Sequence, residues 1–268
     1  MTRLAGLLIP ALLGYAALSH ASADGAPPRI AIIIDDLGYG GAAGERTIRL
    51  PGPVACSVLP GTPHGVRLAR LAHAAGKQVM LHLPMQSLDD IEPAPGLFQV
   101  DTTRAQLAAR VAADLAAIPH VTGINNHRGS LLTRHPGHMA WLMEEIAARE
   151  GLFFVDSYTT AASVALGIAR ESGIPAARRD VFLDPEPDPA TVRREFDRLL
   201  ALARRHGTAL AIGHPYPATL ALLEKELPRL AELGIKLVSP GELVRIRTSE
   251  ANRSWPPSSY RLQTASKK

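Results

Sequence analysis

Short apolar runs alternate with longer segments of helical spacing along most of the chain. The runs are bounded by polar or glycine residues and are rich in β-branched side chains, which is typical of buried parallel strands. Strands are expected at residues 30–34, 54–59, 78–83, 121–125, 152–155, 180–183, 209–212 and 235–238. Helices are expected at residues 63–75, 103–117, 135–149, 160–172, 189–206 and 217–233. This series of strand–helix units predicts one α/β domain built on a parallel barrel, with an open doubly wound sheet as the alternative.

The two ends of the chain differ from this pattern. Arg3, an apolar run from Leu4 to Leu18 and the Ala21-Ser22-Ala23 site predict a cleaved secretory signal at residues 1–23. An uncleaved anchor is the alternative, but the run is shorter than the ~20 residues of a spanning helix. We therefore expect a periplasmic or secreted mature protein without a transmembrane anchor. Residues 24–248 form the predicted barrel domain, and residues 249–268 are expected to be a disordered polar tail.

Charge and cysteine content narrow the possible functions. The formal net charge is +4, but residues 24–248 carry 24 basic and 24 acidic side chains. A neutral domain gives no bulk electrostatic basis for binding nucleic acid, so we expect none. The single cysteine, Cys56, excludes an internal disulfide and is expected to be a small buried hydrophobe.

Residues with metal-binding or acid–base chemistry follow most of the expected strands. They are Asp35 and Asp36, His82, the segment 125–130 that holds His127, Asp156, Asp184 and His214. In a barrel the C-terminal ends of all strands meet at one mouth, so these residues are expected to be neighbours. A buried strand that ends on two adjacent carboxylates needs a ligand or a partner for them, although an aspartate can also cap the next helix. The other seven histidines lie elsewhere and are expected to be solvated or capping residues.

Three of these residues suit a metal. One carboxylate and two imidazoles, with one position left for water, are the ligands of a catalytic zinc site. Asp36, His82 and His127 are our hypothesis for that set. The alternatives are a core histidine bonded to backbone at His82 and an ordinary turn residue at His127.

The remaining strand-end residues suit acid–base catalysis. Asp35, next to a proposed ligand, could act as general base, and His214 could protonate the leaving group from across the barrel. Asp156 or Asp184 could orient a histidine.

Five further residues are expected to contact a substrate. Asn126 and Ser130 belong to the polar loop after the fourth strand, and Tyr39, Tyr158 and Tyr216 each follow a candidate site residue closely. Tyrosine has an apolar face and a polar tip, which suits the rim of a sugar-binding site.

The motifs together resemble the divergent polysaccharide deacetylases, which are related to NodB-type carbohydrate esterases. They are Ile-Ile-Asp35-Asp36-Leu-Gly, His82-Leu-Pro-Met, Gly-Ile-Asn-Asn126-His127-Arg-Gly-Ser130, Phe-Val-Asp156-Ser, Asp180-Val-Phe-Leu-Asp184 and Ile-Gly-His214-Pro. The resemblance covers residues 29–246 and implies a (β/α)7-type barrel with a divalent metal, usually zinc, on Asp36, His82 and His127. It also implies that Asp35 is the base and His214 the acid in deacylation of a glycan.

One position departs from the wider superfamily. Its second motif is His-x-x-x-His, and the second histidine is replaced here by Gln86, a poor metal ligand. The resemblance then implies that His127 supplies the missing nitrogen.

Three functions remain open at this point. The first is a zinc-dependent carbohydrate deacetylase that acts on an envelope polysaccharide such as peptidoglycan. The second is a catalytically lapsed barrel that binds glycan or a partner in envelope remodelling. The third is a metallohydrolase of another substrate class, such as a phosphoester.

Overall fold

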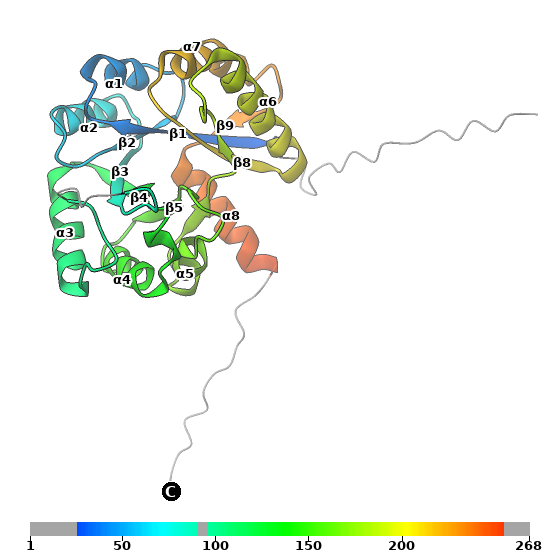
Figure 1. The fold of residues 1–268 in the computed structure, drawn as a ribbon. Helices are drawn as coiled ribbons and strands as arrows, with labels where there is room; N and C mark the ends of the chain where they lie inside the picture. The colour runs from blue at the N-terminus through cyan, green and yellow to red at the C-terminus, as the bar shows by residue number, and fades with distance from the viewer. Residues whose placement is uncertain (1–25, 91–95, 255–268) are drawn as a thin grey trace, which may run out of the picture.

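The structure, a computed structural model, describes residues 26–90 and 96–254 (Figure 1). The strands are β1 (Arg29–Leu37), β2 (Ala55–Val58), β3 (Val79–Met85), β4 (Val121–Arg128), β5 (Phe153–Asp156), β6 (Ala176–Arg178), β7 (Val181–Phe182), β8 (Thr208–Gly213) and β9 (Lys236–Leu237). The helices are α1 (Gly41–Ile48), α2 (Gly65–Ala74), α3 (Arg104–Ala117), α4 (Pro136–Ala147), α5 (Ala165–Glu171), α6 (Pro189–His206), α7 (Pro217–Glu226) and α8 (Pro240–Ser254). Two short 3-10 helices are η1 (Leu132–Arg134) and η2 (Leu227–Arg229).

The strands form one parallel sheet in the order β6-β5-β4-β3-β2-β1-β8-β7, with β9 paired to β1. This order is sequential around a ring in which the last strands return beside β1, whereas a doubly wound sheet reverses its direction at the centre. The sheet curls into a half-barrel with helices outside it (Figure 1). The predicted (β/α) barrel is confirmed.

Local sequence explains how the helices begin and end. In α6 the Asp188 side chain accepts hydrogen bonds from the N–H groups of Ala190 and Thr191. Pro189 begins the helix, and Gly207 ends it in the left-handed conformation.

The two ends of the predicted domain differ in how far the structure describes them. The predicted signal, residues 1–23, lies outside the described residues, as does the tail from residue 255. Residues 249–254, expected to be disordered, instead form the last turns of α8. Leu243 and Val244 anchor that helix inside the barrel, and the helix continues from this anchor beyond the expected boundary. Among the residues described, no helix has the length and apolar character needed to cross a membrane.

Side chains alternate between two cores along each strand. On β1, Ile30, Ile32 and Ile34 face the helices, and Ala31 and Ile33 face the inside of the barrel. The inner core contains Ala31, Ile33, Ala55, Met80, Phe153, Val155, Ala177, Leu210, Ile212, Val238, Leu243 and Val244. Gly123 makes room for this core, because a Cβ atom there would lie within 2.4–2.7 Å of the Phe153 ring. The apolar layer closes the barrel interior below the strand ends.

A polar layer lies directly on this apolar plug. On five strands, the residue two positions after an inner-core residue is polar: Asp35, Ser57, His82, Ser157 and His214. Because side chains two apart share a face, all five point into the barrel mouth. The alternation that builds the core therefore also positions the candidate site.

Candidate metal and catalytic site

Asp35 and Asp36 both reach the barrel mouth because β1 is irregular at its end. In a regular strand two adjacent side chains would point to opposite faces. The register between β1 and β2 shifts between Ile34 and Leu37, and Asp36 has a φ of 57°, in the left-handed region. A bulge of this kind re-aims a side chain, and aspartate is one of the non-glycine residues that adopt this conformation most readily.

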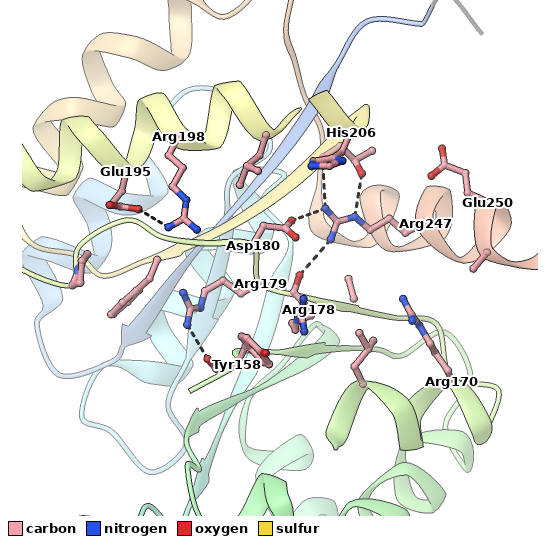
Figure 2. Close-up of a pocket in the computed structure, with 17 residues that line it drawn as sticks. Tyr158, Arg170, Arg178, Arg179, Asp180, Glu195, Arg198, His206, Arg247 and Glu250 are labelled. Atoms are coloured by element: carbon pink, nitrogen blue, oxygen red, sulfur yellow. Dashed lines mark hydrogen bonds and ion pairs between the residues drawn. The ribbon is translucent and has the colours of Figure 1, made fainter. Parts of the chain in front are cut away.

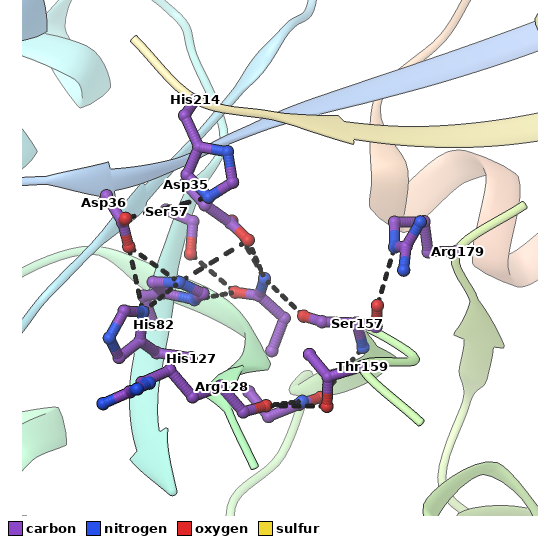
Figure 3. A network of polar contacts seen from close by, with 12 residues as sticks. Asp35, Asp36, Ser57, His82, His127, Arg128, Ser157, Thr159, Arg179 and His214 are labelled. Carbon is purple, nitrogen blue, oxygen red and sulfur yellow. Dashed lines mark hydrogen bonds and ion pairs between the residues drawn. The ribbon is translucent and has the colours of Figure 1, made fainter. Parts of the chain in front are cut away.

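Asp36, His82 and His127 form a compact triangle (Figure 3). Asp36 Oδ1 lies 3.2 Å from His82 Nε2 and 3.0 Å from His127 Nδ1. The two ring nitrogens are 3.2 Å apart. The structure thus brings together the three residues that the sequence suggested as metal ligands.

The triangle fits a metal ion in size. Bonds of about 2.0–2.1 Å place neighbouring ligand atoms about 2.9 Å apart at right angles and about 3.3 Å apart at tetrahedral angles. The three distances fall in this interval. Asp36 Oδ1 is also buried without a hydrogen bond of acceptable geometry in the described chain, although both ring nitrogens are near it. A metal ion at this position would satisfy the carboxylate oxygen and both ring nitrogens together.

Asn125 links this triangle to Asp35. Its side-chain nitrogen donates to Asp35 Oδ1 at 2.9 Å and Oδ2 at 3.1 Å, and its oxygen accepts from Ser57 Oγ at 2.5 Å. The same oxygen lies 3.3 Å from His82 Nδ1. An ionised carboxylate only accepts hydrogen bonds, so the amide nitrogen must face Asp35 and the amide oxygen must face His82. His82 therefore carries its proton on Nδ1 and directs the Nε2 lone pair toward Asp36 and His127.

The two adjacent aspartates have opposite electrostatic environments. Burial raises the pKa of Asp35, against the lowering effect of His82, His214 and Asn125. Burial acts in the same direction on Asp36, but His127 and His82 outweigh it and hold the pKa of Asp36 well below its usual range. Two carboxyl groups whose pKa values are pushed apart in this way suit two different roles.

His214 approaches the triangle from β8. Its Nδ1 lies 2.9 Å from Asp184 Oδ1, and its backbone N–H donates to Asp184 Oδ2 at 2.7 Å. Thr219 Oγ1 also donates to Asp184 Oδ2. Nδ1 thus donates to the carboxylate, and Nε2 faces the site at 3.7 Å from Asp36 Oδ2. Burial acts to lower the pKa of His214, but the hydrogen bond and charge of Asp184 outweigh it, and the pKa is raised.

Two expected site residues lie behind the barrel wall. Asp156 accepts from the N–H of Tyr158 and from Ser163 Oγ, so it shapes the loop after β5 and contacts no histidine in the described chain. Of the two candidates for orienting a histidine, Asp184 is the one in contact with one. Asn126 is fully buried and bonds the Ser157 N–H and the Arg128 carbonyl, so it cannot touch a substrate as expected. Both face outward because they alternate with inward-facing residues.

The other expected substrate contacts lie around the rim. Tyr39 is 71% exposed and Tyr216 is 40% exposed, and the Tyr216 ring lies 5.5 Å from His214. Tyr158 lies beneath the Arg178 guanidinium, 4.1 Å from it. Ser130 accepts from the N–H of Leu88 and so ties two loops together.

Gln86 and Cys56 lie outside the site. The Gln86 side chain accepts from the N–H of Val100 at 3.0 Å, and its backbone joins two loops through Phe98 and Leu131. It contacts none of the proposed ligands in the described chain. Burial raises the pKa of Cys56 to about 12, which leaves no thiolate at neutral pH.

Sequence reasoning missed Ser57, Asn125 and Ser157. Ser57 and Ser157 both bond Asn125, at 2.5 and 3.2 Å, and both are labelled in Figure 3. The alternation of side-chain direction along a strand could have identified them, because each lies an even number of positions from another inward-facing residue on its strand.

Comparison with known proteins supports the family resemblance of the sequence motifs. A family model described as divergent polysaccharide deacetylase matches residues 32–244. Uncharacterized protein YibQ of Escherichia coli (strain K12) is 32% identical over 246 residues, which are 92% of this chain and 76% of that protein. Uncharacterized protein ATU2773 from Agrobacterium tumefaciens C58 superposes with a TM-score of 0.78 at 26% identity, covering 81% of this chain and 89% of that one. The catalytic domain of a peptidoglycan N-acetylglucosamine deacetylase from Eubacterium rectale ATCC 33656 shares the fold, with a TM-score of 0.51 at 14% identity, covering 83% of this chain and 93% of that one.

Proposed function

Since the chain belongs to the divergent polysaccharide deacetylase family, we propose that it is a metal-dependent hydrolase that removes acetyl groups from a carbohydrate of the cell envelope. The observation that carries this proposal is the triangle of Asp36, His82 and His127 between a buried carboxyl group, Asp35, and an oriented imidazole, His214. A site with ligands, base and acid in contact contains the parts that amide or ester hydrolysis needs.

Asp36, His82 and His127 would hold the metal, and one carboxylate with two imidazoles favours zinc. When bound, the metal supplies Lewis acidity: it polarises the acyl carbonyl and makes a water molecule more acidic. Everything else in the reaction falls to the protein's own residues.

Asp35 is the proposed base. Its Oδ2 lies 3.5 Å from His82 Nε2, so it borders the metal position without belonging to the triangle. Two hydrogen bonds from Asn125 hold the carboxylate in place, and its raised pKa makes it a better proton acceptor than an exposed aspartate. It would take the proton from the attacking water.

His214 is the proposed acid. The Asp184 carboxylate fixes its Nδ1–H and stabilises the protonated ring, so Nε2–H is presented to the site. It would donate this proton to the leaving amine or alcohol of the sugar.

The proposal includes the cellular setting. The leader at residues 1–23 and the family together support export to the periplasm or the medium, where an envelope polysaccharide is the available substrate. Mature protein beginning at Asp24 in an exported fraction would support this, and Met1 retained on membrane-bound protein would contradict it.

The test of the function is acetate release from acetylated oligosaccharides by the zinc-loaded mature protein. We expect release by the parent, and release reduced to near the blank by His214→Ala and Asp35→Asn. Equal release by the parent and both variants would remove these residues from the mechanism. No release above the blank across peptidoglycan- and chitin-type fragments would instead favour the lapsed, glycan-binding barrel.

A further inference from the structure

The half-barrel has an open side, and a large cavity lies there. β6 and β7 are the two ends of the hydrogen-bonded strand order, and side chains around them line a cavity of about 1200 Å³ (Figure 2). Arg247 of α8 joins the two edges: it pairs with Asp180 at 2.5 Å and donates to the Arg178 carbonyl at 3.3 Å. The cavity exceeds the range of about 300–1,000 Å³ that is usual for small-molecule sites, which favours an extended ligand.

Five arginines line this cavity, and they fall into two groups. Arg247 pairs with Asp180, and Arg198 pairs with Glu195 at 3.3 Å, so each of these two arginines has a carboxylate partner. The other group is Arg170, Arg178 and Arg179, which form no ion pair with any residue that the structure describes. We call these three the arginine cluster.

The direct contacts of Arg178 and Arg179 in this cluster are with neutral groups. Arg179 donates to the carbonyl oxygens of Ser157 at 2.7 Å and Tyr158 at 3.0 Å, which are neutral acceptors. Arg178 lies over the Tyr158 ring, a cation–π contact. Burial lowers the pKa of Arg179 more than the charges of Asp35, Asp156 and Asp180 raise it.

The cavity begins next to the proposed acid. Phe182 lines the cavity, and its ring lies edge-on to His214 with the centroids 5.4 Å apart. The Arg179 guanidinium is 4.9 Å from the same ring, and Ser157, to which Arg179 binds, also bonds Asn125 (Figure 3). Phe182 and Arg179 therefore lie between the cavity and the surroundings of His214.

We propose that the arginine cluster binds carboxylate groups carried by the glycan beside the acetylated sugar, so that the substrate is an acidic glycan. This deepens the proposed function and rests on it for the identity of the reacting sugar. Guanidinium groups match carboxylates in shape and charge, and the Tyr158 ring offers a face for a sugar. The cationic character is local, since residues 24–248 carry equal numbers of basic and acidic side chains.

The experiment is calorimetric titration of the mature protein at low ionic strength with two oligosaccharides of equal length. One is an N-acetylglucosamine oligomer, and the other carries carboxylates on alternate sugars, either as uronates or on lactyl-peptide stems. We expect the acidic oligomer to bind about tenfold more tightly, as one or two charge-assisted hydrogen bonds would give. The uronate and peptide-stem arms show where on the sugar the carboxylate must sit.

Arg178→Gln and Arg170→Gln should each reduce the preference for the acidic oligomer, and the double variant, which keeps Arg179, should reduce it further than either single variant. The matched control is Arg70→Gln on α2, an exposed arginine that loses the same charge outside the cavity and should keep the full preference. Equal binding of neutral and acidic oligomers by the parent would overturn the proposal. An equal effect of Arg70→Gln, or equally tight binding of a single-stranded oligonucleotide, would also overturn it, because the attraction would then be unspecific.

The two proposals can fail separately. Acetate release without a preference for acidic oligomers would contradict the cavity alone. Preferential binding of the acidic oligomer without acetate release would contradict the hydrolase and leave the cavity standing.

Discussion

The candidate site has two sides that differ in burial and bonding. The buried side consists of Asp35, Ser57, His82 and Asn125, each at most 2% exposed. The open side consists of Asp36, His127 and His214, whose side chains are 33%, 28% and 17% exposed. The buried side is held by an unbroken set of hydrogen bonds around Asn125, whereas Asp36 Oδ1 on the open side lacks one. The hydrogen bonds of the buried side fix the orientation of Asp35 and His82. The open side leaves lone pairs of the carboxylate and imidazoles available to a metal, water or substrate.

Asp35 and Asp36 show what this difference does to one residue type. They are adjacent in sequence, yet the pKa of Asp35 is raised and that of Asp36 is lowered. Desolvation decides the first, and two neighbouring imidazoles decide the second. One bulge thus gives a single strand end two carboxyl groups whose pKa values are shifted in opposite directions.

The largest effect on rate is expected from Asp35→Asn. An amide cannot accept the proton of the attacking water, and loss of a general base costs roughly 10²- to 10⁴-fold in rate. Acetate release by the zinc-loaded variant measures this. A rate within a few-fold of the parent would mean that the buried side positions groups without taking part in proton transfer.

Asn125→Leu should be the next largest. It removes the acceptor for His82 Nδ1 and both donors to Asp35, so we expect zinc affinity to fall by about 10- to 100-fold. Titration with a competing chelator measures the affinity. The matched control is Asn126→Leu, an equally buried neighbour that bonds the loop at Ser157. It should lower thermal stability while zinc affinity stays near that of the parent, and equal affinity losses in the two variants would contradict the special role of Asn125.

Asp184→Asn should change the pH profile more than the maximal rate. The Asp184 charge raises the pKa of His214, so its removal lowers that pKa. A general acid works only while protonated, and the alkaline limb of kcat should therefore move to lower pH. Asp156→Asn, which alters a carboxylate that contacts no histidine in the described chain, should leave the limb in place. An unmoved limb in Asp184→Asn would exclude His214 as the acid.

Gln86→Ala should have the smallest effect on the site. The side chain accepts from Val100 N–H and contacts none of the proposed ligands in the described chain, so we expect full zinc content and a rate within a few-fold of the parent. Loss of one such hydrogen bond should cost about 0.5–1.5 kcal/mol of the free energy of unfolding, measurable by denaturant titration. Loss of zinc in this variant would show that Gln86 supports the open side after all.

Much of the fold follows from the sequence because buried parallel strands leave a plain signal. Most expected strands correspond to strands of the sheet. The sequence analysis did not predict α1, because the helix begins Gly-Ala-Ala-Gly and glycine has a low helix propensity. Gly44 instead allows close packing against Leu68. β6 was missed because Ala176–Arg178 is short and lacks an apolar run, so only its pairing with β5 makes it a strand.

The site residues were predicted from a different signal than the strands were. Strand-end chemistry located Asp35, His82, His127 and His214, but it did not tell inward from outward positions. Asn125 lies two positions from His127 and therefore points inward, whereas Asn126 points outward. Likewise Ser157 lies two positions from the inner-core residue Val155 and points inward, whereas Asp156 points outward. Asp36 does not follow this alternation, and the sequence gives no sign of the bulge that brings it into the site.

The central claim is that Asp36, His82 and His127 hold the metal while Asp35 does not. Its most direct test is the zinc content of purified mature protein, by mass spectrometry of the metal, for the parent, Asp36→Asn and Asp35→Asn, with His82→Ala and His127→Ala beside them. We predict about one zinc per chain in the parent and in Asp35→Asn, and loss of most of it in the other three variants, because a three-ligand site does not survive the loss of one. Full zinc in Asp36→Asn together with its loss from Asp35→Asn would contradict the account.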